Sequence, residues 1–392
     1  MRAPRLVRIC WVLVALCGAA GLPVPGASWT GGINSVSETA GACPRGAAYP
    51  DGCAGAPIGP MQHPQLFSAP LKPHNSPYPV RPPWNVAGVD YYAGVPANLK
   101  LASLEDTGAL PACASFNAST GLVWVNATPC NLSAIDFSPQ GACVYIPAHA
   151  GSDAVSVTNS RFAVGSTSGC KGAYLVSSSR EFRGSLFVAN NSFFGNGPTT
   201  QAMSGAIGSG GSGAVTIQYN YITRIDQHGI DFSAAPSSIS EQYNVITDFG
   251  MEVGSHPDFT YFCGGEFRNV RIEYNLSAEW FGDGSQPGAE LMTLHADRHC
   301  GSSLIDPVIQ HNVVLAPGTG HRKAETASYA LAPIKDQGRT LSGANLSHNF
   351  VDWSGAYGPI YPGKGTGFIC VGNIDINRGV GIKGRFGNVT CE

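Results

Sequence analysis

Short apolar segments, each closed by an asparagine, recur through the C-terminal part of the chain. In five of them an apolar residue stands three positions before the asparagine, as in Ile217-Gln218-Tyr219-Asn220. The recurring asparagines are Asn191, Asn220, Asn244, Asn275, Asn312, Asn349 and Asn373, with gaps of 29, 24, 31, 37, 37 and 24 residues. Repeats of this size built from short β segments indicate a solenoid. The irregular gaps favour a parallel β-helix, because loops of any length can leave a corner without disturbing its strands.

Asparagine suits such a corner for two reasons. It tolerates a left-handed backbone conformation, and its side-chain amide can bond to the same asparagine one coil away. We therefore predict an all-β fold with under a tenth of the chain helical. The strands are expected in parallel sheets at residues 215–219, 229–232, 250–253, 270–274, 289–292, 307–311 and 344–348.

The phrases Val157–Phe162 and Asn191–Asn196 follow the same coil pattern. Over residues 135–390 the chain resembles the right-handed parallel β-helix group that includes pectate lyases, polygalacturonases and phage tailspikes, the pectin lyase-like superfamily. The resemblance implies a right-handed parallel β-helix. The chain contains no complete catalytic motif of any one enzyme family.

Residues 1–27 read as a secretion signal. Arg2, Arg5 and Arg8 precede an apolar run, Ile9–Leu16, and small residues follow it. The run is too short to span a bilayer. We expect a secreted protein, extracellular or periplasmic.

Residues 28–97 are rich in proline and glycine and cannot supply regular sheet or helix. We predict an extended N-terminal arm that lies on the solenoid; a disordered linker is the alternative. Trp84, Tyr91 and Tyr92 favour the packed arm. The β-helix domain is expected over residues 98–392.

The overall charge limits the possible partners. The formal net charge is −3 and only 12% of residues are charged, so binding to nucleic acid has no electrostatic support. A polybasic membrane patch is also absent from the sequence. We expect a monomer that binds neither nucleic acid nor membrane.

The chain has twelve cysteines, two of them in the signal, Cys10 and Cys17. An even remainder in an exported chain indicates disulfides. The spacing favours pairing of neighbours, which gives five bonds: Cys43 with Cys53, Cys113 with Cys130, Cys143 with Cys170, Cys263 with Cys300, and Cys370 with Cys391.

Candidate chemistry lies on three similar segments. Gly229-Ile230-Asp231-Phe232, Gly250-Met251-Glu252-Val253 and Gly288-Ala289-Glu290-Leu291 each place a carboxylate between apolar residues. Because strand side chains alternate, the carboxylates should point outward when their neighbours fill the core. We therefore expect the three acids at one register of one sheet.

Like charges at about 5 Å repel, so either one acid keeps its proton or a cation lies between them. A protonated acid beside an ionised base is the arrangement of glycosidases. A cation held by Asp231, Glu252 and Glu290 would be Ca²⁺, because its ligands are oxygens. The alternative is that these acids are ordinary solvated residues.

Further polar residues lie near these segments in sequence. His228, His295 and Arg298 are candidate catalytic residues, because histidine is a suitable acid or base near neutral pH. The candidate substrate-binding residues are basic groups for a uronate carboxylate and aromatic rings for stacking on sugars. They are Arg322, Lys323, Trp280 and Tyr361.

Three functions follow from this reading. We prefer a secreted lyase that cleaves a uronate-containing polysaccharide, since clustered acids with histidine and arginine fit metal-assisted proton abstraction. A glycoside hydrolase, inverting or retaining, is the second hypothesis. The third is a solenoid that binds glycans or covers a surface without catalysis.

Overall fold

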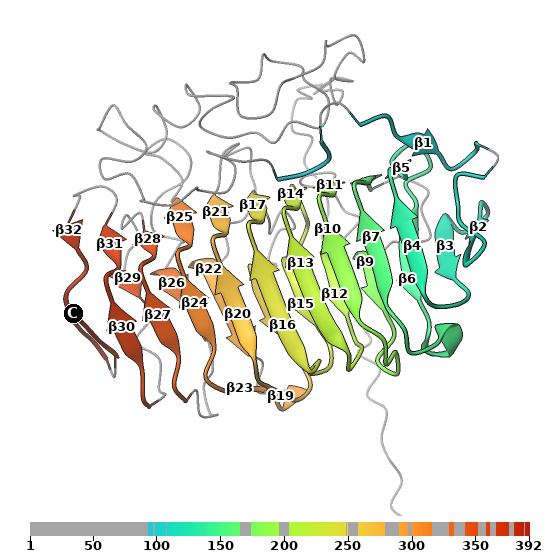
Figure 1. The fold of residues 1–392 in the computed structure, drawn as a ribbon. Helices are drawn as coiled ribbons and strands as arrows, with labels where there is room; N and C mark the ends of the chain where they lie inside the picture. Colours follow the sequence, from blue (N-terminus) through green and yellow to red (C-terminus); the bar gives the residue numbers. More distant parts are fainter. Residues whose placement is uncertain are drawn as a thin grey trace, which may run out of the picture.

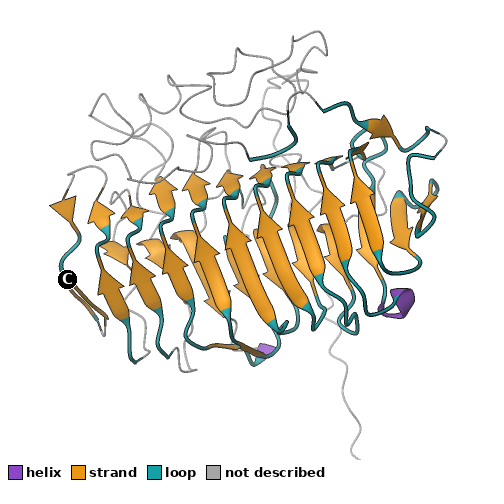
Figure 2. Cartoon of the chain, in the orientation of Figure 1, coloured by secondary structure: helices purple, strands orange, loops and turns teal. Residues whose placement is uncertain are grey.

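The computed structural model describes residues 93–96, 99–106, 108–164, 174–195, 204–247, 249, 258–278, 290–296, 300–315, 329–332, 342–351, 358–360, 366–375, 380–387 and 389–392. These residues form a right-handed parallel β-helix, as predicted (Figure 1). Helical structure in the described part is limited to short 3-10 turns such as η1 (Ala148–Ala150) (Figure 2). No helix among these residues has the length and apolar character needed to cross a membrane.

Each complete coil contributes one strand to each of three long sheets. The first sheet precedes the asparagine corner and contains nine strands: β4 (Cys130–Ser133), β7 (Val155–Thr158), β10 (Leu186–Ala189), β13 (Ala214–Gln218), β16 (Ser238–Gln242), β20 (Val270–Glu273), β24 (Val308–Gln310), β27 (Asn345–Ser347) and β30 (Ile369–Val371).

The second sheet follows the corner and has eleven short strands. They are β1 (Ala102–Ser103), β5 (Ile135–Asp136), β8 (Arg161–Ala163), β11 (Ser192–Phe194), β14 (Tyr221–Thr223), β17 (Val245–Thr247), β21 (Leu276–Ala278), β25 (Val313–Leu315), β28 (Phe350–Val351), β31 (Ile374–Asp375) and β32 (Val380–Gly381).

The third sheet closes each coil and has ten strands. They are β2 (Ala114–Asn117), β3 (Leu122–Val125), β6 (Cys143–Ile146), β9 (Tyr174–Ser178), β12 (Gly205–Ser209), β15 (His228–Phe232), β18 (Thr260–Phe262), β22 (Glu290–Ala296), β26 (Tyr329–Ala332) and β29 (Gly358–Ile360). Two small pairs complete the described strands: β19 (Glu266–Phe267) with β23 (Ser303–Leu304), and β33 (Gly384–Phe386) with β34 (Val389–Cys391).

Neighbouring coils pair in parallel along all three sheets, and the antiparallel pairs among described strands lie at the two ends of the solenoid. The expected strands are confirmed except 250–253, which lies outside the described residues. Alternation places aliphatic residues such as Val188, Ile217 and Ile272 in the core, where none is exposed. Phe137, Phe162 and Phe193 stack on one another inside the solenoid, with ring centroids 4.4 and 4.9 Å apart.

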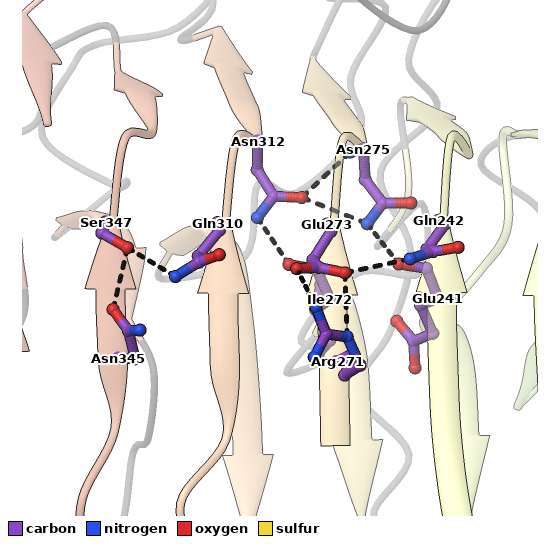
Figure 3. Close-up of polar contacts among 10 residues, drawn as sticks. All are labelled: Glu241, Gln242, Arg271, Ile272, Glu273, Asn275, Gln310, Asn312, Asn345 and Ser347. Carbon is purple, nitrogen blue, oxygen red and sulfur yellow. Dashed lines mark hydrogen bonds and ion pairs between the residues drawn. The ribbon is translucent and has the colours of Figure 1, made fainter. Parts of the chain in front are cut away.

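The predicted asparagine ladder is present in full. Each asparagine is buried and donates its Nδ2 to the Oδ1 of the next. The Asn275 to Asn312 bond is 3.1 Å (Figure 3). The Asn312 to Asn349 bond is 3.0 Å. The same Nδ2 also donates to a backbone carbonyl, as Asn312 does to Ile272 at 2.8 Å. Every coil from Asn191 to Asn373 is therefore fixed at this corner to the coils beside it.

One part of the corner prediction was wrong. The left-handed residue is the one before each asparagine, with φ between 54° and 67°: Asn190, Tyr219, Tyr243, Tyr274, His311, His348 and Gly372. This residue turns the chain, and the asparagine that follows is left free to align its amide with the ladder. The five aromatic members form a stack at the edge of the corner, with ring centroids 4.8 to 5.3 Å apart.

Three predicted disulfides are confirmed: Cys113–Cys130, Cys263–Cys300 and Cys370–Cys391. Cys143 is also disulfide-bonded, and its predicted partner, Cys170, lies outside the described residues. The pair Cys43 and Cys53 lies outside them as well. Of the predicted arm, residues 93–96 are described, and Ala93 and Val95 are buried.

Candidate active site

Strand β15 carries Asp231 on the outer face of the third sheet. Ile230 and Phe232, on either side of it, are fully buried in the core. Asp231 is in register with Gly208 on β12 and with Tyr261 on β18. The alternation predicted for this strand is therefore confirmed. Asp231 is nevertheless only 6% exposed, because a tyrosine covers it.

The covering residue is Tyr174 on β9. Its hydroxyl donates a short hydrogen bond to Oδ2 of Asp231. The ring lies across Gly205 and Gly208, and a Cβ atom added at Gly208 would come within 2.5 Å of a Tyr174 ring carbon. Glycine inside a strand often marks such a close approach. The two glycines thus make the space in which Tyr174 reaches the acid.

Burial raises the pKa values of both Asp231 and Tyr174. It raises the pKa of Asp231, as does the charge of Asp258, while the Tyr174 hydrogen bond and His228 oppose the rise. Burial and the nearby Asp231 also raise the pKa of Tyr174 above its ordinary value. Oδ1 of Asp231 is buried and has no hydrogen-bond partner among the described residues. Asp231 is therefore an acid that holds its proton more strongly than usual and has one oxygen uncommitted.

His228 and Asp258 form a second pair beside Asp231. Nδ1 of His228 lies 3.1 Å from Oδ2 of Asp258 and 3.2 Å from the backbone nitrogen of the same residue. The first contact requires a proton on Nδ1 and the second requires a lone pair, so only one can be a hydrogen bond. We favour the carboxylate, because charge-assisted bonds are stronger and the Asp258 side chain is 4% exposed. That choice leaves Nε2 of a neutral His228 as a base.

Tyr261 holds the imidazole from the next strand. Its ring stacks on that of His228, with centroids 4.5 Å apart and planes 9° from parallel. Its hydroxyl lies 3.8 Å from Sγ of Cys300, the partner of Cys263. The Cys263–Cys300 disulfide therefore lies against a residue of the cluster.

The predicted alignment of three carboxylates was wrong in register. The position of Asp231 is taken by Tyr261 one coil on and by His295 in the coil after that. Glu290 begins β22 and is in register with Tyr329, ahead of His295. The cause is that β18, rather than the segment 250–253, forms the next strand of the sheet. Glu252 lies outside the described residues.

The remaining predicted site residues stay predictions. The structure describes the backbone of His295 and Glu290 without placing their side chains. The other five lie outside the described residues: Trp280, Arg298, Arg322, Lys323 and Tyr361. Within the described part, no three His, Cys, Asp or Glu residues are grouped so that they could hold a metal ion. The calcium prediction needs Glu252 and Glu290 as well as Asp231 and stays a prediction.

Sequence reasoning did not select Tyr174, Asp258 or Tyr261 as site residues. The signal available for Tyr174 was the pair Gly205 and Gly208 within a strand, which indicates that another group approaches the backbone there. Asp258 and Tyr261 carried no such signal, because the strand that positions them was assigned to the wrong segment.

Comparison with protein-family models, with curated proteins and with solved structures finds no match for this chain. The molecule is thus defined by its architecture as a parallel β-solenoid with a polar cluster on the outer face of its third sheet. Evidence about its activity comes from the cluster itself.

Proposed function

We propose that this protein is a secreted, pectin lyase-like enzyme that cleaves a uronate-containing polysaccharide by β-elimination on the outer face of the third sheet. The observation that carries the proposal is the cluster of Tyr174, Asp231, His228 and Asp258. A buried acid with an uncommitted oxygen stands there beside a histidine held by a carboxylate. The three described disulfides support the export of the chain.

β-Elimination needs a base, an acid and a group that neutralises the uronate carboxylate. His228, oriented by Asp258, would remove the proton from the carbon next to the carboxylate. Asp231, whose pKa is raised, would give its proton to the departing glycosidic oxygen, with Tyr174 fixing its geometry. Arg180 lies close enough to act on the pKa of Asp231 and would face the substrate carboxylate, a role also predicted for Arg322 and Lys323.

A glycoside hydrolase is the second candidate. Asp258 is close enough to Asp231 for its charge to raise the pKa of that acid. Two carboxyl groups whose pKa values are pushed apart by their surroundings are the acid and base of glycosidases. A solenoid that binds glycans without catalysis is the third candidate and would use the same face.

Purified protein should be incubated with a panel of uronate-containing and neutral polysaccharides, with and without a chelator. A lyase releases an unsaturated product that absorbs ultraviolet light, whereas a hydrolase releases reducing ends without that absorbance. Retention of polysaccharide without cleavage identifies a binder. Loss of activity with chelator, restored by Ca²⁺, would support the predicted calcium site. If no polysaccharide is bound or cleaved, the proposal is wrong.

A further inference from the structure

The outer face of the second sheet carries an apolar column that the core does not explain. Its members occupy one register on five successive strands and are at most 1% exposed: Tyr221, Val245, Leu276, Val313 and Phe350. The residue after Tyr221, Val245, Val313 and Phe350 belongs to the buried core in each case, so the column itself faces outward. Outward residues of the first sheet in these coils, such as Gln218, Gln242 and Gln310, are polar and partly exposed.

Apolar side chains that face out of the sheet are shielded from water only when another segment of protein packs on them. The described segment on it is the end of the N-terminal arm. Gly94 donates its backbone N–H to the carbonyl of Tyr219 at 2.7 Å, and Val95 donates to Oγ of Ser192 at 3.0 Å. Ser192 is in register with Tyr221 on the next strand, so Val95 lies beside the strand that precedes the column. Ala93 and Val95 are 0% and 2% exposed.

We propose that the arm, residues 28–92, continues from this point and covers the column, which is its docking surface. Five strands span about 20 Å, a distance that about seven residues cover in a polyproline conformation. The arm has ample length for this. The prolines of the arm suit this position. A segment that packs on the side chains of a sheet forms no backbone ladder with it, and proline has no backbone N–H that would be left without a partner. Trp84, Tyr91 and Tyr92 supply the apolar surface that the column requires.

Photo-crosslinking in the full-length protein tests this proposal. The change Phe350→p-benzoylphenylalanine places a photoreactive ring in the column with little change in shape, and Tyr221→p-benzoylphenylalanine repeats it at the other end. After irradiation, peptide mapping should find most adducts on peptides from residues 28–92. The matched control is Gln242→p-benzoylphenylalanine, on the outer face of the first sheet, which should give at least tenfold fewer arm adducts.

Adducts on peptides from residues 248–341 would overturn the proposal, because loops between coils would then be the cover. Crosslinked dimers would also overturn it, since the column would then bind a second copy. So would the absence of any adduct with arm peptides. As an independent measurement, Leu276→Asp should make the arm at least tenfold more sensitive to protease. An unchanged cleavage rate in a folded Leu276→Asp protein would contradict arm docking.

Discussion

The asparagine ladder and the Asp231 cluster are both buried and polar, and they lie on the same coils. In the ladder, an asparagine such as Asn312 donates to a carbonyl and to the next asparagine and accepts from the one before. In the cluster, Asp231 has one bonded oxygen and one buried oxygen without a partner among the described residues. The ladder repeats in every coil from Asn191 to Asn373, whereas the cluster occurs once among the described residues.

The difference separates architecture from chemistry. A polar group that is repeated and fully hydrogen-bonded avoids the penalty of a buried unpaired group and fixes the fold. A polar group that is single and incompletely bonded destabilises the fold, and such groups gather where substrates bind. On this reasoning the corner holds the solenoid together, and we propose the outer side of the third sheet as the active face.

Glu241 on β16 is a second buried acid that is incompletely hydrogen-bonded, so it tests whether such a group always marks a substrate site. It occupies the core register of Ile217 and Ile272, and it is fully buried. Its Oε2 accepts a 2.8 Å hydrogen bond from Thr260, and its Oε1 has no partner among the described residues. Glu241 thus repeats the bonding of Asp231, yet it faces the interior, where no substrate reaches. We assign it no catalytic role.

The largest expected effect is the pH dependence of stability that Glu241 causes. Burial raises its pKa from 4.5 to about 8. The folded protein keeps this proton up to about pH 8, whereas the unfolded chain releases it above about pH 4.5. Stability should therefore fall by about 5 kcal/mol as the pH rises from 4.5 to 8. The free energy of unfolding, measured in urea between pH 4.5 and 8, should depend much less on pH in Glu241→Gln than in the wild type. An equal pH dependence in the two proteins would contradict the assignment.

The second prediction concerns the ladder. Asn312→Leu removes the acceptor of Asn275 and the donor to Ile272 and Asn349. Leaving these buried groups unbonded should lower the free energy of unfolding by about 3 to 5 kcal/mol. The control Gln310→Ala loses one bond, to Ser347, at a partly exposed site and should cost about 1 kcal/mol or less. Similar costs for the two changes, measured by urea unfolding, would show that the ladder is dispensable.

The third prediction concerns the glycine beneath Tyr174. Gly208→Ala places a methyl group where the ring lies, which should shift Tyr174 away from Asp231. We expect activity to fall about tenfold or more, with a stability cost of about 1 to 3 kcal/mol. The matched control is Gly381→Ala, where the nearest atom to the new methyl is 3.7 Å away. Wild-type turnover by Gly208→Ala would rule out a role for the tyrosine.

The smallest effect is expected at the aromatic stack. Burial, with a contribution from His348, lowers the pKa of His311. The unfolded chain therefore binds a proton more readily, and stability should fall as the pH drops below about 6.5. Because the site is partly exposed, the loss should stay below about 1 kcal/mol. His348→Gln should reduce this loss in urea unfolding at pH 5 and 7, and an unchanged loss would exclude coupling between the two rings.

The sequence was sufficient for the coils because their signal is repeated. Asn220 and Asn275 each follow an apolar strand at a constant offset, so every copy supports the others. The candidate site has no second copy in the part of the chain that the structure describes. Asp231 was found through its flanking Ile230 and Phe232, but the match of Glu252 and Glu290 to it relied on short glycine-acid phrases. Tyr174 lies 57 residues from Asp231 in sequence, and only the register of β9, β12 and β15 brings them together.

The most direct test of the central claim is a paired measurement on the two buried carboxyls. Asp231→Asn and Glu241→Gln each replace a titratable carboxyl with an amide of nearly the same shape, and both should be assayed on the polysaccharide that gives turnover. We predict that Asp231→Asn lowers the rate by about a hundredfold or more, while folded Glu241→Gln stays within about twofold of the wild type. Full activity in Asp231→Asn would contradict the account, because the outer face of the third sheet would then not be the active face.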